Sequence, residues 1–178
     1  YGWQWRHFGA NYSTYDANYD GQGVDQLKKV VEKLKSDPND RRMICMAWNP
    51  SDLHRMALPP CHYGFHVTVI NGKLNLLWNQ RSVDTPLGLP FNIACYGLLL
   101  HLLAKECGLK EGKLVGFLAD THIYVNQLEG IKEQLKRKPY PLPSLITEDF
   151  STIFDWKYTD SKVIDYEHHP TIKFDISV

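Results

Sequence analysis

The sequence lacks an excess of charge of either sign. Its 178 residues include 20 Lys+Arg and 20 Asp+Glu, so the formal net charge is zero. Proteins that bind nucleic acid through bulk electrostatics carry a clear excess of basic residues, so we expect no DNA partner. No apolar run approaches the roughly 20 residues of a membrane span, and the first residues do not form a secretory signal pattern. These absences favour a cytoplasmic protein without membrane contact.

Cysteine is scarce and irregularly spaced. The four cysteines are Cys45, Cys61, Cys95 and Cys107. The intervals between them, 16, 34 and 12 residues, match no zinc pattern and no CxxC redox motif. Because Cys45 and Cys95 lie in apolar runs, buried free thiols in a reducing compartment are favoured over two disulfides. Adjacent His168 and His169 have no carboxylate or cysteine partner at a ligand spacing, so we expect no metal site.

The sequence does contain enough apolar material for one domain. Hydrophobic residues make up 43% of the chain, and no repeat or linker interrupts it, so we expect a single domain over 1–178. Val24, Leu27 and Leu34 stand at helical spacing among charged residues, and the turn-forming residues 36–40 follow them. This pattern predicts an amphipathic helix.

The remaining elements predict an α+β fold. Asn71-Gly72 between two β-rich runs predicts a hairpin over 63–82. The helix predicted over 90–109 is apolar on nearly all sides, so we expect it to be central and buried. Further predictions are a strand over 41–50, a strand, turn and helix over 113–139, and strands within 154–178. Regular βαβ alternation is absent, which favours α+β.

The run MALPPCH places two prolines before a cysteine and a histidine after it. Pro59 and Pro60 fix their φ angles and could hold the Cys61 sulfur in one place. A thiol attacks as its thiolate, which nearby cations stabilise. The local sequence leaves two interpretations open, a nucleophile or a buried structural cysteine beside a turn.

The run NQRSVD, residues 79–84, follows an apolar strand. A guanidinium beside a hydroxyl, as at Arg81 and Ser82, suits a phosphate group because it offers a planar fork of donors. A solvated loop with one ion pair fits the same residues.

Two further pairs are open to two interpretations each. Arg41 and Arg42 could share one anion or form a solvated turn. His122 and Tyr124 are two residues apart, so they share a face if the segment is extended. They could bind sugar hydroxyls or be satisfied core groups. Together the candidates suggest a thiol nucleophile and arginines for a phosphorylated small molecule.

Five segments together resemble the thymidylate synthase family: YGWQWRHFGA, DPNDRRMICMAWNPSDLHRMALPPCH, NQRSVDTPLGLPFNIACY, LADTHIYVNQLE and HHPTIKFDISV. They stand in the family's order and span the chain. The resemblance implies a mixed sheet packed on a central buried helix with flanking helices, and a homodimer formed through the sheet face. It implies methylation of deoxyuridine monophosphate (dUMP) to thymidylate (dTMP), with 5,10-methylene-tetrahydrofolate as one-carbon and hydride donor.

The resemblance also implies roles for individual residues. Cys61 matches the nucleophile that attacks pyrimidine C6, and Asn92 matches the side chain that reads the uracil edge. The matched catalytic positions are Cys61, Tyr1, His62, Arg81, Asn92 and Asp84; the substrate positions are Arg41, Arg42, Gln80, Arg81, Ser82, Asn92, His122 and Tyr124; the folate positions are Asp84, Leu87, Gly88, Phe91 and Val178.

Within these sets, Tyr1 and His62 match a water and proton network. Arg81 and Ser82 match phosphate contacts, and Arg41 and Arg42 match a pair that reaches the partner subunit's site. His122 and Tyr124 match the deoxyribose contacts. The terminal residue matches one whose carboxylate end closes over the folate.

Several positions depart from the family pattern. His66, Thr68 and Asn79 replace glutamine, tyrosine and tyrosine on the hairpin, so we expect them to alter the dimer interface rather than the chemistry. Cys95 replaces a serine and Gln127 a histidine. The family also has a preceding part with a phosphate-binding arginine, a glutamate and a tryptophan that have no counterpart here, so we expect no turnover by these 178 residues alone.

Two alternative functions fit the same residues. A dUMP or dCMP hydroxymethylase uses the same thiol and folate, but water captures the methylene group. Asn92 favours uracil over cytosine, since an aspartate would suit a cytosine edge. A non-catalytic nucleotide- or RNA-binding relative is the other alternative, although zero net charge argues weakly against RNA.

Overall fold

The computed structural model describes residues 1–177, so the prediction for Val178 lies outside the described residues. The helices are α1 (Gly2–His7), α2 (Gln26–Ser36), α3 (Gly88–Glu106), α4 (Leu128–Lys136) and the 3-10 helices η1 (Leu53–Arg55), η2 (Val125–Gln127) and η3 (Tyr158–Asp160). The strands are β1 (Ile44–Met46), β2 (His62–Ile70), β3 (Lys73–Asp84), β4 (Lys110–His122), β5 (Ser144–Thr147) and β6 (Ser161–Ile164). This mixture confirms the α+β class.

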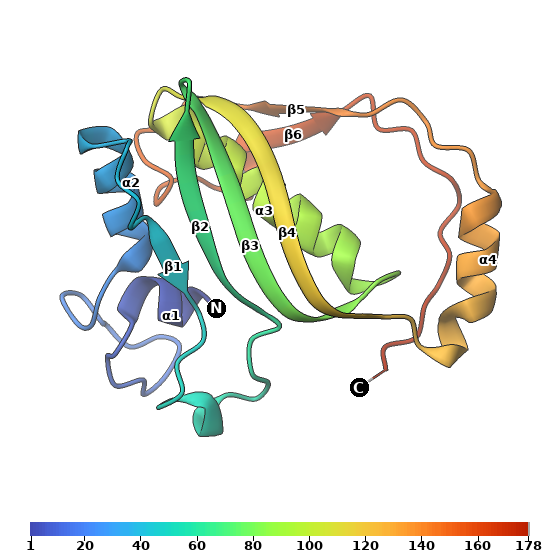
Figure 1. The fold of residues 1–178 in the computed structure, drawn as a ribbon, viewed down its shortest axis with the longest axis horizontal. Coiled ribbons are helices and arrows are strands. Elements are labelled where there is room, and N and C mark those ends of the chain that lie inside the picture. Colours follow the sequence, from blue (N-terminus) through green and yellow to red (C-terminus); the bar gives the residue numbers. More distant parts are fainter. Residues whose placement is uncertain (178) are drawn as a thin grey trace.

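A four-stranded sheet with the order β1-β2-β3-β4 organises the chain (Figure 1). β2 is antiparallel to both β1 and β3, whereas β4 is parallel to β3. The predicted hairpin is confirmed: Asn71 and Gly72 have φ angles of 51° and 72°, which this pair adopts readily in a two-residue turn. The strand predicted over 41–50 is shorter than expected, because only the three residues of β1 pair with β2.

α3 connects β3 to β4 and lies across one face of the sheet (Figure 1). Tyr96, Leu100 and Leu103 are buried in the core cluster that α3 forms with the sheet. The helix begins at Gly88, two residues before the predicted start, because Pro90 is tolerated in the first helical turn. Gly108, with a φ of 64°, follows its end as predicted.

The first half of α3 is exposed on one side in the described chain, whereas the consecutive residues Leu102, Leu103 and Ala104 are all buried. Phe91 and Ile93 are 68% and 45% exposed, and Cys95 is exposed. The expectation of a fully buried helix is therefore not confirmed, and the prediction of a buried thiol is wrong for Cys95. α3, with 19 residues and a mean hydropathy of 1.2, is also long and apolar enough to cross a membrane by length and composition alone. The expectation that no apolar run approaches this length is wrong. The core helix of a folded domain can have the same length and hydropathy.

The predicted amphipathic helix is confirmed as α2, which packs its apolar face beside β1. Its N-cap Asp25 accepts a hydrogen bond from the Lys28 backbone N–H at 2.9 Å, which satisfies one of the free N–H groups of the first turn. Val30, Val31 and Leu34 are buried. They join the same core as β1–β3 and α3, so one hydrophobic core holds this part of the chain together.

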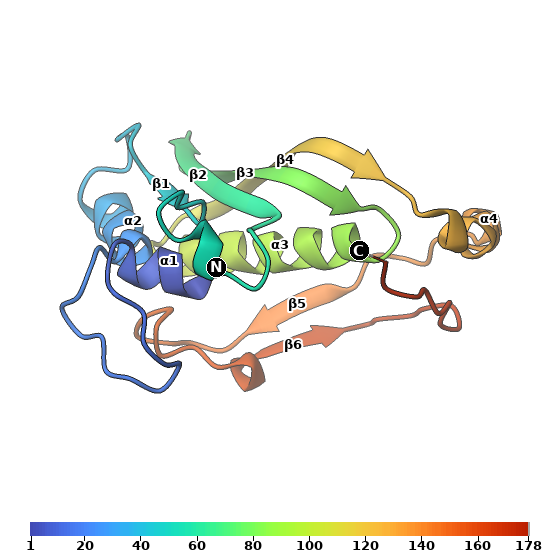
Figure 2. The same cartoon turned by 90° about the horizontal axis from the view of Figure 1, so that it is seen from below.

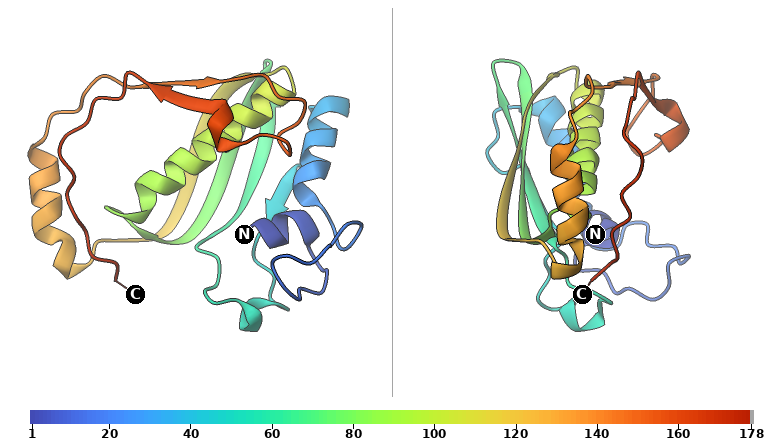
Figure 3. Two further views of the ribbon diagram at one scale, coloured as in Figure 1. Left: turned by 180° about the vertical axis from the view of Figure 1, so that it is seen from behind. Right: turned by 90° about the vertical axis from the view of Figure 1, so that its right-hand side faces the viewer.

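The β5–β6 hairpin forms a third layer, on the side of α3 that faces away from the sheet (Figure 2). Within the tail, only β6 is a strand, so the other strands predicted over 154–177 are wrong. Residues 165–177 instead run beside α4, at one end of the molecule (Figure 3). Arg137 donates to the Pro170 carbonyl at 2.6 Å, and the Phe174 ring lies against Gly130 of α4.

Candidate active site

The sheet register brings most of the predicted site residues to one edge. His62, at the start of β2, pairs with Gln80 near the end of β3. Because β3 and β4 are parallel, their carboxyl ends meet at this same edge, where Asp84 pairs with His122. The first turn of α3 follows at once and adds Asn92. Ligand sites commonly form where parallel strands end in this way.

Arg81 holds the cysteine loop in place. Its Nε and Nη2 donate to the Pro60 and Pro59 carbonyls at 2.9 and 2.8 Å, and its backbone N–H donates to the Cys61 carbonyl at 2.8 Å. Nη2 also lies 3.9 Å from the Cys61 sulfur. The prolines therefore supply fixed carbonyls to the guanidinium, which in turn places a positive charge beside a half-buried thiol.

A stacked pair of rings lies next to this thiol. Tyr1 and His62 are parallel within 6° with centroids 3.9 Å apart, and the Tyr1 hydroxyl accepts from the Cys61 backbone N–H at 2.8 Å. Burial lowers the pKa of His62 to about 4 and raises the pKa of Tyr1. Both rings are therefore uncharged at neutral pH.

Tyr96 fixes the tautomer of His62. The Tyr96 hydroxyl lies 2.8 Å from His62 Nδ1, and within residues 1–177 it has no second hydrogen-bond partner. Burial raises the pKa of Tyr96, so its hydroxyl keeps its proton and donates it to Nδ1. The proton of the neutral imidazole is then on Nε2, which becomes a hydrogen-bond donor.

Trp78, Gln80 and Asn92 form a directed chain of hydrogen bonds. The indole N–H can only donate, and it donates to Gln80 Oε1 at 3.1 Å. Gln80 Nε2 then donates to the Ser82 carbonyl at 3.0 Å and to Asn92 Oδ1 at 2.9 Å. The Asn92 oxygen is occupied by Gln80, and the Asn92 NH₂ group has no partner among residues 1–177, so it can donate to a ligand. Gln80 is 1% exposed and lies behind Asn92.

Asp84 and the β4 loop are tied together by Gln127. Gln127 Nε2 donates to Asp84 Oδ2 at 2.8 Å, and its Oε1 accepts from the Tyr124 backbone N–H at 3.0 Å. The His122 ring meets the Tyr124 ring edge-on at 4.9 Å, and its Nδ1 lies 3.2 Å from an Asp120 oxygen. The predicted pair His122 and Tyr124 is thus brought together beside Asp84.

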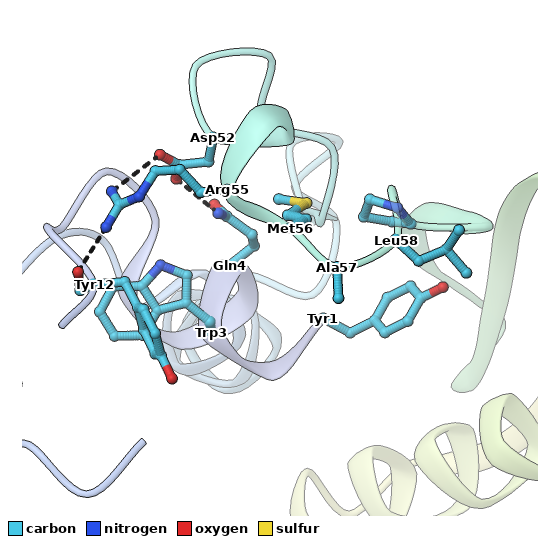
Figure 4. Close-up of a pocket in the computed structure, with 10 residues that line it drawn as sticks. Tyr1, Trp3, Gln4, Tyr12, Asp52, Arg55, Met56, Ala57 and Leu58 are labelled. Atoms are coloured by element: carbon cyan, nitrogen blue, oxygen red, sulfur yellow. Dashed lines mark hydrogen bonds and ion pairs between the residues drawn. The ribbon is translucent and has the colours of Figure 1, made fainter. Parts of the chain in front are cut away.

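A cavity of about 340 Å³ opens beside Tyr1, between α1 and the loop that leads to Cys61 (Figure 4). Its polar rim includes Asp52, which accepts from Gln4 at 2.9 Å, and Arg55, which donates to the Tyr12 carbonyl at 2.6 Å. Leu58, on the opposite wall, is 65% exposed. The volume lies in the range of small-molecule sites.

Comparison with known proteins agrees with this geometry. A model of the thymidylate synthase family matches residues 1–178. The chain belongs to the thymidylate synthase family. It is 49% identical to human thymidylate synthase, 48% to the thymidylate synthase of Saccharomyces cerevisiae and 49% to the bifunctional dihydrofolate reductase-thymidylate synthase of Paramecium tetraurelia. All of this chain aligns with each relative, but it spans only 57%, 62% and 38% of their respective lengths.

Some family positions lie outside the cluster around Cys61. Arg41 and Arg42 are exposed and precede β1, so the predicted strand geometry does not apply to them. β1 begins opposite His66, four residues along β2 from His62, which is about 13 Å of extended strand. The structure therefore does not bring the two arginines to Cys61. Arg42 instead lies 3.5 Å from Asp40.

The folate-matched positions surround the start of α3. Leu87 and Gly88 are partly exposed at its N-terminus, and Phe91 projects into solvent. Ser82, which precedes this turn on β3, is partly exposed and pairs with Asp120 of β4. These residues lie at the same edge of the sheet as Cys61.

Sequence reasoning missed three supporting residues of this thymidylate synthase site. Trp78 and Tyr96 stand in apolar runs, which predict core positions. Nothing in their spacing indicates that they have polar partners. Gln127 was noticed only as a departure from the family. The signal that the sequence offers is its position three residues after Tyr124, beside a predicted site.

Proposed function

We propose that the polypeptide carrying this chain converts dUMP to dTMP with 5,10-methylene-tetrahydrofolate. The relatives are named as thymidylate synthases, and membership of their family supports the reaction class. The observation that carries the proposal is the Cys61 sulfur, held 3.9 Å from the Arg81 guanidinium at the edge where the other matched residues converge.

Cys61 is the nucleophile of the proposed reaction. Its thiolate adds to pyrimidine C6, a C–S bond forms, and the ring electrons move onto O4 as an enolate. The Asn92 NH₂, left free by Gln80, can donate to that oxygen where negative charge develops. C5 would then bond to the one-carbon unit that the folate supplies and would lose its proton as the reduced folate leaves. Hydride from the folate would complete the methyl group, and the C–S bond would break to return the thiolate. An NH₂ donor matches O4 of uracil and opposes the amino group of cytosine, which favours dUMP over dCMP.

The nucleotide's phosphate and sugar are assigned to neighbouring groups. Arg81 Nη1 has no partner among residues 1–177, so it can reach a phosphate while Nε and Nη2 hold the loop. Ser82 lies beside it. We assign the deoxyribose hydroxyl to His122 and Tyr124, whose rings meet at the same edge.

We also propose a homodimer through the face of the sheet that α3 leaves uncovered. Ile44, Val115 and Phe117 are 47%, 43% and 62% exposed on strands of that sheet. In this arrangement Arg41 and Arg42, which the fold holds away from Cys61, would serve the partner subunit's phosphate site.

The folate would supply the one-carbon unit and a hydride. The residues present fit its aromatic rings, because Phe91 and Leu58 expose apolar surface beside the site and Asp84 offers carboxylate oxygens for ring N–H groups. We assign the folate to Asp84, Leu87, Gly88 and Phe91, and the closing contact to Val178. Tyr1 and the Nε2–H of His62 would hold water next to the pyrimidine.

Product analysis tests the proposal. The natural polypeptide that carries this chain is mixed with dUMP and the folate, and we expect dTMP and dihydrofolate. With 5-fluoro-dUMP, whose fluorine cannot leave as a proton does, mass spectrometry should show a covalent adduct on the peptide containing Cys61. Hydroxymethyl-dUMP with tetrahydrofolate would indicate the hydroxymethylase instead. Absence of both adduct and product would overturn the proposal.

A further inference from the structure

Gln127 joins the two loops that carry the proposed sugar and folate contacts. We propose that it is a positioning residue that couples nucleotide binding to folate binding. The inference rests on the function proposed above and adds a role to a residue that touches neither ligand. The side chain is 1% exposed, so it acts only through its neighbours.

Both ends of the Gln127 amide are used inside the protein. Nε2 donates to Asp84 Oδ2 at 2.8 Å, and Oε1 accepts from the Tyr124 backbone N–H at 3.0 Å. The first of these bonds involves a carboxylate, and bonds to charged groups are stronger than neutral ones. Loss of either partner leaves a buried polar group unsatisfied, which is costly. The amide therefore sets the distance between Asp84 and Tyr124.

Asp84 extends this link to the start of α3. Its other oxygen, Oδ1, accepts from the Leu87 backbone N–H at 3.1 Å. A parallel backbone bond runs from Thr85 N–H to the His122 carbonyl at 2.9 Å. Two links thus join the segment with the proposed sugar contacts to the turn with the proposed folate contacts. One is the backbone bond from Thr85 to His122, and the other is made by the Gln127 side chain. A shift of one loop is passed to the other.

An isosteric change at Gln127 gives this coupling a distinctive pH dependence. In Gln127→Glu a second carboxylate faces Asp84, so the bond is replaced by repulsion unless one of the two carboxyls is protonated. The other titratable groups on the joined segments are His122, Tyr124 and, at 3.2 Å from His122, Asp120. These groups are the same in the variant and in the parent. The ratio of each constant in the variant to that in the parent, taken at each pH, therefore reports on the new carboxyl.

The experiment measures the Kd for dUMP and the KM for the folate at pH 8 and pH 5.5, in the natural polypeptide. We expect Gln127→Glu to raise both constants about tenfold at pH 8, as for a lost bond to a charged group, with partial recovery at pH 5.5. Val125→Ala is the matched control, since Val125 is 84% exposed in the same turn. It should leave both constants unchanged.

A second variant keeps the test decisive if the glutamate variant does not fold. Gln127→His retains one N–H donor and one acceptor, so both constants should stay close to the parent's at pH 8. A change in only one constant, or an equal loss at both pH values, would overturn the coupling. If the parent protein binds no dUMP, the proposed function is overturned as well. If the parent binds dUMP and Gln127→Glu has the same constants as the parent, only the role of Gln127 is overturned.

Discussion

Two cysteines, one within a strand and one just before the neighbouring strand, show how position in one sheet decides chemistry. Cys45 is central in β1, opposite Phe65, and is fully buried; burial raises the pKa of its thiol to about 12. Cys61 directly precedes β2, is half-buried and has the Arg81 guanidinium 3.9 Å from its sulfur. The same side chain is enclosed in the core at one place and lies beside a guanidinium at the other.

The difference lies in what surrounds each thiol. Around Cys45 the strands are paired, so their backbone polar groups are occupied, and the thiol is fully buried in the hydrophobic core. Around Cys61 the strands end, so carbonyls such as those of Pro59 and Pro60 are free to anchor a guanidinium. Interior positions thus stabilise the fold, and edge positions can hold charge.

Replacing each cysteine with alanine is the strongest test of this comparison. Cys61→Ala should abolish the covalent adduct with 5-fluoro-dUMP, because no thiolate remains to form the C–S bond. Cys45→Ala should keep the adduct and lose about 1 kcal/mol of unfolding free energy, as for a small cavity in the core. Intact-mass analysis and urea unfolding measure the two effects. Adduct formation in Cys61→Ala would refute the assignment of the nucleophile.

Gln80 tests whether an interior residue controls an edge residue. In Gln80→Glu no NH₂ faces Asn92, so the Asn92 amide is expected to turn its own NH₂ inward and its oxygen toward the pyrimidine. The preference for dUMP over dCMP should then fall about 100-fold, since hydrogen-bonded sites discriminate strongly. Competition binding of the two nucleotides measures this ratio. An unchanged ratio in a folded variant would show that Asn92 is oriented by something else.

The placement of the site could largely be predicted from the sequence, but its supporting contacts could not. The hairpin, α2 and the grouping of His122 with Tyr124 follow from local signals that fix local geometry. Tyr96 supports His62 from 34 residues away, and Gln127 reaches Asp84 across 43. No periodicity shows which buried polar group will meet which partner at such separations.

The errors have physical causes as well. Apolar composition predicted a central α3, but composition reports how hydrophobic a helix is and not what covers it. The exposure of Phe91 and Ile93 therefore could not be predicted from composition. In the tail, strands were predicted within 154–178, yet residues 165–177 pack beside α4, where Phe174 lies against Gly130, instead of pairing.

Arg81 makes the edge thiol different from the interior one, so its removal should make Cys61 behave more like Cys45. In Arg81→Gln the sulfur loses its neighbouring cation and the cysteine loop loses two anchoring hydrogen bonds, so alkylation of Cys61 by iodoacetamide at pH 7 should slow about tenfold. Arg55→Gln, which removes a guanidinium from the cavity rim, is the control. Equal alkylation rates in Arg81→Gln and the parent would show that neither the charge of Arg81 nor its hold on the loop affects the reactivity of the thiol.

His62 is the edge group that most resembles the interior, because burial disfavours the charged form of its ring. Burial lowers its pKa from 6.5 to about 4, so the unfolded chain binds a proton below pH 6.5 that the folded chain does not bind until about pH 4. His62 therefore contributes stability that is fully present above pH 6.5 and is lost as the pH falls through this window. His62→Gln, which keeps an acceptor for Tyr96, should have a shallower decline in melting temperature between pH 6.5 and 4. His54→Gln, at an exposed histidine, should decline like the parent, and an equal decline in all three proteins would mean that the His62 imidazole is not held neutral by burial.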